Sequence, residues 1–164
     1  MAEPLYDVQT LWELVERRAA ESPDRVMLVD EQDRRVTFEE FKRWAERTAA
    51  GFFELGVRES TAVTWQLPTR METVVASMAL SRLGAVQNPI IPIYRQREVG
   101  FLLGETGAEW FLVPGVWRGF DYLDMATGLA KEMESPPAVM VVYDSLPVGD
   151  PAVLPPVPVV SGDP

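Results

Sequence analysis

The amino-acid sequence predicts an α/β protein with three layers, built on a doubly wound and largely parallel β-sheet. Short apolar segments without polar alternation recur along the chain, as expected for strands that are covered on both faces. Segments with helical periodicity separate these strands, at the spacing of strand–helix–strand units. Glycine or proline stands at the end of most segments, which fixes the expected boundaries.

Helical periodicity is found in five segments, which cover residues 8–21, 38–55, 70–83, 95–105 and 121–134. Ser22-Pro23-Asp24 ends the first, and Thr37 is a suitable N-cap for the second, whose first turn carries two acidic residues. Gly56 ends the second helix. The third is apolar over most of its surface and is expected to be nearly buried. Gly84 follows it and is expected in the left-handed conformation that ends a helix.

Six short segments are predicted to be strands, at residues 26–30, 35–38, 62–67, 85–90, 110–113 and 138–143. The first two flank the polar turn Glu31-Gln32-Asp33-Arg34 and are expected to pair as a hairpin. Pro89 and Pro92 close the strand at 85–90 and fix the corner after it. The later strands alternate with helices and are therefore expected to be parallel.

The composition changes at Asp144. The last 21 residues hold six prolines, three aspartates and no basic residue, so they cannot form a helix or a central strand. We therefore divide the chain into an α/β subdomain, residues 1–143, and a Pro-rich linker, residues 144–164. We expect the linker to contribute little to stability.

Composition excludes several classes of function. The net charge of −10 over 164 residues argues against nucleic acid, because neutralising phosphates needs clustered Lys and Arg. The sequence contains no apolar run long enough for a membrane span. Cysteine and histidine are absent, which removes thiol chemistry and the commonest general base, and a chain without cysteine fits the reducing cytoplasm.

Four polar residues are the candidates for a ligand pocket. Gln66, Thr69 and Arg70 lie where the strand at 62–67 meets its helix, at the end of a parallel sheet where ligands usually bind. Asn88, the only asparagine, lies in the strand at 85–90. An exposed turn is the competing explanation for these positions. No residue is assigned a catalytic, cofactor-binding or metal-binding role.

Other patterns have ordinary structural explanations. Gly100, Gly104 and Gly107 are not a dinucleotide motif, because they lie within and after a helix that precedes a strand. Close helix packing and a helix stop explain them better. Arg95 and Arg97 are expected to be solvated, and a core position is expected for four aromatic residues, Trp65, Trp110, Phe111 and Trp117.

Three motifs resemble those of the adenylate-forming acyl-CoA synthetases. Leu83-Gly84-Ala85-Val86 with Asn88-Pro89 and Pro92 resembles the family's L-x-x-G-A-V-x-x-P-x-x-P pattern. Residues 36–41, Val-Thr-Phe-Glu-Glu-Phe, resemble its first motif, and residues 98–113 resemble the helix and strand that follow. The resemblance covers residues 8–143 and is greatest to fatty-acid and cyclohexanecarboxylate CoA ligases. It implies the N-terminal subdomain of an acyl-CoA synthetase-like fold.

The resemblance implies a chemistry whose residues lie outside this sequence. Family members use ATP and Mg²⁺ to convert a carboxylic acid into an acyl-adenylate, which CoA then attacks. Their phosphate-gripping Ser/Thr/Gly-rich loop has no match here, and neither Lys42 nor Lys131 matches a catalytic lysine. We therefore expect an N-terminal fragment of an acid–CoA ligase, a fatty-acid ligase by its closest sub-group, that is inactive alone.

In that intact ligase the fragment is expected to scaffold the adenylating core and to form part of the acyl pocket. Its expected partners are the remainder of the ligase chain, the acid substrate and a second copy in a homodimer. Two alternatives stay open at this point. One is a stand-alone binding or regulatory module derived from such a ligase, and the other is an unrelated three-layer α/β fold that binds a small molecule.

Overall fold

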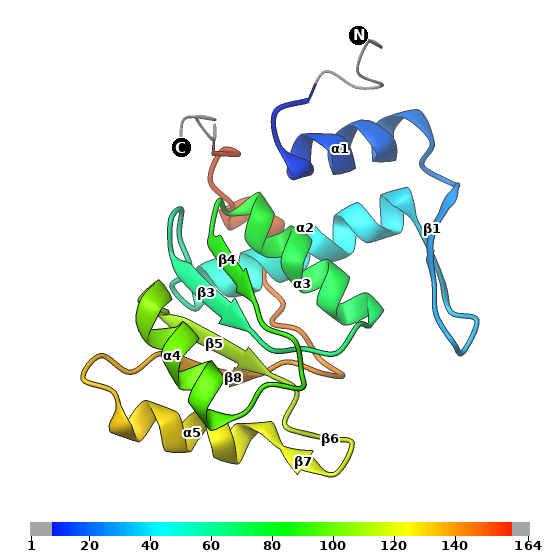
Figure 1. Ribbon diagram of the computed structural model, residues 1–164. Helices are drawn as coiled ribbons and strands as arrows, with labels where there is room; N and C mark the ends of the chain where they lie inside the picture. Colours follow the sequence, from blue (N-terminus) through cyan, green and yellow to red (C-terminus); the bar gives the residue numbers. More distant parts are fainter. Residues whose placement is uncertain (1–7, 159–164) are drawn as a thin grey trace, which may run out of the picture.

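A four-stranded parallel sheet organises the structure, a computed structural model that describes residues 8–158. The strand order is β4–β3–β5–β8, where the strands span Val86–Pro89, Ala62–Trp65, Trp110–Val113 and Ala138–Val141 (Figure 1). The chain runs from β3 outward to β4, returns to β5 on the other side of β3, and continues to β8. The winding direction therefore reverses between β3 and β5, as in a doubly wound fold.

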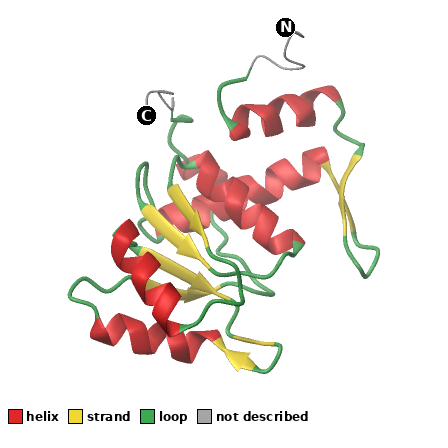
Figure 2. Cartoon of the chain, viewed as in Figure 1, coloured by secondary structure: helices red, strands yellow, loops and turns green. Residues whose placement is uncertain are grey.

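Helices cover both faces of this sheet (Figure 2). One layer contains α2 (Phe38–Glu54) and α3 (Met71–Arg82), and the other contains α4 (Gln96–Thr106) and α5 (Tyr122–Glu132). The side chains of β5 alternate between two cores, because Leu112 packs with the α2–α3 layer while Phe111 and Val113 pack with the α4–α5 layer. The predicted three-layer, doubly wound α/β fold is thus confirmed.

The N-terminal part packs outside the α2–α3 layer. Helix α1 (Leu11–Glu21) buries Trp12 completely against α2 and α3, and β1 (Val26–Val29) pairs antiparallel with β2 (Arg35–Thr37) as predicted. Thr37 caps α2, since its hydroxyl accepts from the Glu40 N–H while the Glu40 carboxylate accepts from the Thr37 N–H.

The glycines after α3 and α4 have the roles that the sequence predicts. Gly84 has φ +71° and Gly107 has φ +56°, which are left-handed conformations at helix ends. A Cβ added at Gly100 would lie 3.0 Å from Leu129 Cδ2, so this glycine allows α4 to pack closely against α5. The explanation by packing and helix stops is therefore confirmed for Gly100 and Gly107, whereas an added Cβ at Gly104 would meet no atom within 4 Å.

A second hairpin was not predicted. Strands β6 (Val116–Trp117) and β7 (Phe120–Asp121) pair antiparallel just before α5. Each has two residues, which is too short to give a periodic signal. The reversal depends on positive φ values at Arg118 and Gly119, 48° and 77°. An arginine in that conformation gives no turn signal in the sequence.

The described part of the Pro-rich segment, residues 144–158, lies along α2 and α3. The Gly149 N–H donates to the Arg47 carbonyl at 2.9 Å, and the buried Arg82 donates to the Pro155 carbonyl at 2.8 Å. Leu146 and Leu154 pack on the α2–α3 core, and a short 3-10 helix, η1, spans Pro151–Val153. Because of these contacts, we expect residues 144–158 to contribute to the stability of the fold. The subdomain boundary at residue 143 stays a prediction.

Candidate functional site

A groove lies where the carboxyl ends of the parallel strands meet the β6–β7 hairpin. Its volume is about 490 Å³. It is lined by residues from the loops after β3 and β4, from the hairpin and from the start of α5: Leu67, Pro68, Thr69, Pro92, Ile93, Arg95, Trp117, Arg118, Phe120 and Tyr122. The loop after β3 borders the point where the winding direction reverses, and open α/β sheets bind ligands outside the strand ends at such a point.

Aromatic rings and guanidinium groups give the groove its chemical character. The Arg95 guanidinium carbon lies 4.0 Å from the centroid of the Phe120 ring, and that of Arg118 lies 4.7 Å from the Trp117 ring. Phe120 also packs edge-to-face on Tyr122, with 4.9 Å between centroids. An apolar body could contact the rings while a negative group approached the guanidinium edges.

The loop after β4 is fixed in place by hydrogen bonds from a residue just after β3 and from a residue at the start of α5. Gln66 is fully buried, and its Nε2 donates to the carbonyls of Ile91 and Tyr94 at 3.0 and 3.1 Å. The Tyr122 hydroxyl donates to the Pro92 carbonyl at 2.8 Å. Gln66 therefore holds the wall of the groove without lining it.

The other predicted site residues do not all reach the groove. Thr69 lines it and is exposed. Asn88 donates to Thr64 Oγ1 at 3.3 Å, and the Thr64 hydroxyl lies 3.4 Å from that of Thr106 on α4. Asn88 thus belongs to a polar contact between the sheet and α4, away from the groove lining. The role of these residues in a substrate pocket stays a prediction.

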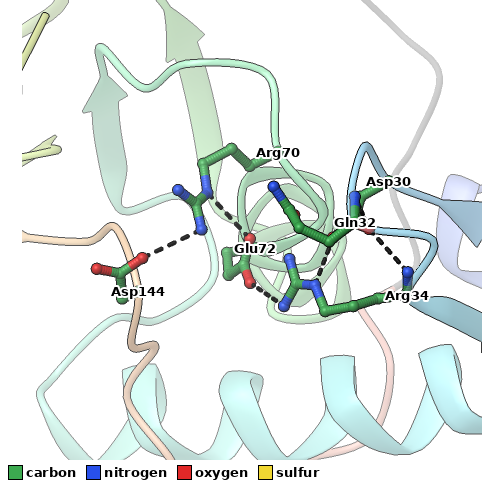
Figure 3. A network of polar contacts seen from close by, with 6 residues as sticks. All are labelled: Asp30, Gln32, Arg34, Arg70, Glu72 and Asp144. Carbon is green, nitrogen blue, oxygen red and sulfur yellow. Dashed lines mark hydrogen bonds and ion pairs between the residues drawn. The ribbon is translucent and has the colours of Figure 1, made fainter.

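Arg70 belongs to an ionic network that connects three distant parts of the chain (Figure 3). The network is centred on Glu72, whose side chain is only 7% exposed and accepts from Arg70 at 3.2 Å and from Arg34 at 3.0 Å. Arg34 also pairs with Asp30 in the β1–β2 hairpin. Arg70 donates to Asp144 at 3.1 Å and lies over the Tyr143 ring, just after β8.

The network controls the charge of Glu72. Burial alone would raise the pKa of the Glu72 carboxyl, but hydrogen bonds from Arg34, from its own backbone N–H and from Arg70 outweigh burial and lower that pKa. The same hydrogen bond from Arg34 to Glu72, and then the one to Asp30, raise the pKa of Arg34. Glu72 is therefore held ionised at neutral pH.

The first turn after β3 does not fit a nucleotide phosphate. Phosphate sites of this type need free backbone N–H groups at the helix N-terminus. Here the first turn of α3 carries the Glu72 carboxylate, and a glycine-rich loop is absent between β3 and α3. Within residues 8–158 no group of three or more Asp, Glu, His or Cys side chains could hold a metal ion.

Sequence reasoning missed most of the groove. Arg95, for which the sequence predicts a solvated position, lines the groove. Trp117 packs against the α4–α5 core as predicted, but it also lines the groove. Phe120 and Tyr122 were not considered. The residues come together because of the unpredicted β6–β7 hairpin. Three aromatic residues and one arginine lie within residues 117–122, and this is the signal that could have drawn attention to them.

Comparison with known proteins places the chain in a family. The sequence profile of the AMP-binding enzymes matches residues 15–161. This chain belongs to the AMP-binding enzyme family. It is 29% identical over 137 residues to the 2,3-dihydroxybenzoate-AMP ligase of Bacillus subtilis. The matched region covers 84% of this chain and 25% of that protein. It is 34% identical over 123 residues to a 2-hydroxy-7-methoxy-5-methyl-1-naphthoate–CoA ligase of Streptomyces carzinostaticus, covering 75% and 22%.

Solved AMP-binding enzymes share the fold. A fatty acyl CoA synthetase of Mycobacterium tuberculosis superposes with a TM-score of 0.70 at 22% identity, over 81% of this chain and 26% of that one. The chain therefore spans about a quarter of the length of these relatives. Membership of the family removes the alternative of an unrelated three-layer fold. In the described part of the chain, no helix is long and apolar enough to cross a membrane.

Proposed function

We propose that this chain is the N-terminal part of an ATP-dependent ligase that activates a carboxylic acid as an adenylate and transfers it to CoA. Its role in that ligase is to scaffold the adenylating core and to form one wall of the acid pocket. The observation that carries the proposal is the groove beside the topological switch point, in a chain that belongs to the AMP-binding enzymes.

The chemical steps require groups that this sequence does not supply. Attack of a carboxylate on the α-phosphate of ATP needs cationic groups that stabilise the developing charge. ATP, Mg²⁺ and CoA are therefore assigned to the parent ligase, whose remaining chain is the main partner of this part. We expect no ATP turnover by the isolated chain. Pyrophosphate release from ATP and a fatty acid, clearly above background on the purified chain, would contradict this.

A fatty acid is the substrate that we propose, because the groove offers apolar and aromatic surface to an alkyl chain and guanidinium groups to its carboxylate. The names of the relatives include aryl acids as well, so the test must compare both. Decanoate, 2,3-dihydroxybenzoate and uncharged decanol would be titrated into the isotope-labelled chain, with amide shifts followed by NMR.

Decanoate is expected to shift the amides of Thr69, Ile93 and Phe120 most. Decanol should shift them less, because it lacks the charge that meets Arg95 and Arg118. Stronger shifts with 2,3-dihydroxybenzoate would replace the fatty acid with an aryl acid. Shifts confined to residues outside the groove for all three compounds would overturn the assignment of this surface to the acid.

A stand-alone binding or regulatory module remains the alternative function. The reading frame beyond Pro164 separates the two, since a Ser/Thr/Gly-rich phosphate loop soon after it supports the ligase and a stop codon supports the module. The cytoplasmic location also stays a prediction.

A further inference from the structure

Helix α4 presents an apolar face with no covering element among residues 8–158. Its buried side chains are Val99 and Leu103, which face the sheet and α5. Phe101, on the opposite side, is 65% exposed. It borders a shallow groove of about 600 Å³ whose lining follows helical spacing: Tyr94, Arg97, Glu98, Phe101 and Leu102. Such a stripe is the usual surface for packing against another helix.

The orientation of this face is fixed by the packing behind it. Gly100 lies against Leu129 of α5, where an added Cβ would be 3.0 Å from Leu129 Cδ2. Val99 and Leu103 are fully buried on either side of that contact. Helix α4 therefore cannot rotate to bury Phe101 without losing this packing. Figure 1 shows α4 at the outside of the molecule, beside α5.

Two of the three charged side chains on α4, Arg97 and Glu105, are arranged symmetrically about Phe101, while the third, Glu98, lies at the position symmetric to Gly104. Arg97 lies four residues before it and Glu105 four residues after it, and both side chains are exposed. Neither forms an ion pair with another described residue. Gly104 lies three residues after Phe101, and an added Cβ there would meet no atom within 4 Å. A glycine on an exposed helix face permits a second helix to approach closely.

We propose that α4 is a self-complementary interface through which two copies of this chain pair. When two identical helices pack antiparallel about a two-fold axis at Phe101, each residue faces its mirror position in the other copy. Arg97 then faces Glu105 of the second copy, and Glu105 faces Arg97 of the second copy. Glu98 faces the open space at Gly104. The two aromatic rings meet at the centre of the interface.

The sign of the charges selects this partner and this direction. An isologous contact must be complementary to itself, and a helix face with opposite charges at equal distances on either side of an apolar centre meets that condition. A parallel pair would bring Arg97 against Arg97 and Glu105 against Glu105. The net charge of −10 on each copy opposes association, so the contact is weak and must be measured at physiological salt.

Sedimentation of the complete chain, from about 10 μM to about 1 mM in about 0.15 M salt, measures the pairing. Each single charge reversal, Arg97→Glu or Glu105→Arg, creates two like-charge contacts and should raise the dissociation constant about tenfold or more. Phe101→Ser should raise it as well. Lys131→Glu on α5 is the matched control, because it gives the same net charge as Arg97→Glu, −10 − 2 = −12, and should leave pairing nearly unchanged.

Restoration by complementary charges gives the sharpest result. The double variant Arg97→Glu/Glu105→Arg should pair as the parent does. A mixture of the two single variants should form a mixed dimer, since both contacts then join Glu to Arg. A monomer at all concentrations would overturn the proposal. So would a dimer that the single reversals leave intact, or one that the complementary charges fail to restore. The outcome is independent of the activity of any parent ligase.

Discussion

Glu72 lies in an environment that is unusual for its residue type. Glutamate is rarely buried without a partner, and here one carboxylate with little exposure accepts from two arginines that belong to different segments. It connects the first turn of α3 to the β1–β2 hairpin through Arg34 and to the chain after β8 through Arg70. The stability of that connection depends on the ionised carboxylate.

Glu72→Gln is expected to destabilise the protein by about 1–3 kcal/mol, because two guanidinium groups lose their charged partner. The loss should depend on pH. The pKa of Glu72 is lowered on folding, so its stabilisation is fully present above its ordinary value of 4.5 and disappears as pH falls through the lowered value. Thermal unfolding of both proteins from neutral to acidic pH should show the two melting temperatures converging.

Asp33→Asn is the control for this experiment. Asp33 pairs with Arg35 in the same hairpin, but both side chains are well exposed, at 73% and 61%. Asparagine also tolerates the left-handed backbone at this position, where φ is 58°. We expect a change within about 0.5 kcal/mol. An effect as large as that of Glu72→Gln would mean that hairpin charges in general, rather than burial at Glu72, set the stability.

Gly84→Val tests the left-handed stop after α3. Valine disfavours φ +71°, and a Cβ here would lie 2.9 Å from Pro158 Cγ. Strain alone should cost about 1–3 kcal/mol. Chemical denaturation measures the free energy of unfolding, and a midpoint equal to that of the parent would show that the turn relaxes freely.

At the scale of elements, the contact between α2 and the Pro-rich segment gives an unusual test. Gly51 lies inside α2, and an added Cβ would lie 2.5 Å from both Pro147 C and Val148 N. Gly128 lies inside α5, and an added Cβ would meet nothing within 4 Å. Both glycines thus have a helical backbone conformation. They differ because the segment at 147–148 lies against α2 at Gly51, whereas no atom lies close to Gly128.

Alanine at these two positions should therefore change stability in opposite directions. Gly128→Ala should stabilise by up to about 1 kcal/mol through helix propensity. Gly51→Ala should destabilise by about 1–3 kcal/mol, because the segment at 147–148 must move away. Urea denaturation of the two variants measures both signs. Stabilisation by Gly51→Ala would show that residues 147–148 do not lie on α2 in solution.

The elements themselves were predictable where the sequence carries a local signal. Periodicity and the Thr37 cap located α2, and apolar runs located the parallel strands to within a few residues. The β6–β7 hairpin was not predictable, since two-residue strands have no period and Arg118 replaces the usual turn residue. The groove was therefore not predictable either, because residues of this hairpin form part of its lining. Gln66 illustrates the same limit, because its hydrogen bonds to Ile91 and Tyr94 are tertiary.

At the scale of the whole molecule, the Pro-rich segment closes two of the hydrophobic clusters. Truncation after Tyr143 should destabilise the protein by about 2–4 kcal/mol, because Leu146, Leu154 and Val157 leave partly buried positions. Arg82 also loses its hydrogen bond to Pro155. Calorimetry of the shortened and complete chains gives the difference. Equal melting temperatures would restore the original expectation that this segment adds little.

The contact between Val157 and the cluster around Trp12 sets an order on folding. The two residues are 157 − 12 = 145 positions apart, so this cluster closes last as the chain leaves the ribosome. The strands of the parallel sheet can pair once β8 has emerged. The hydrophobic cluster around α1, by contrast, stays partly uncovered until residues 146–157 have been synthesised. Until then the guanidinium of Arg82 lacks its Pro155 partner, and the side of the cluster that Leu146 and Val157 cover is accessible to water and to chaperones. Synthesis from the N-terminus therefore leaves the helical layer that holds α1 as the vulnerable part of the nascent protein.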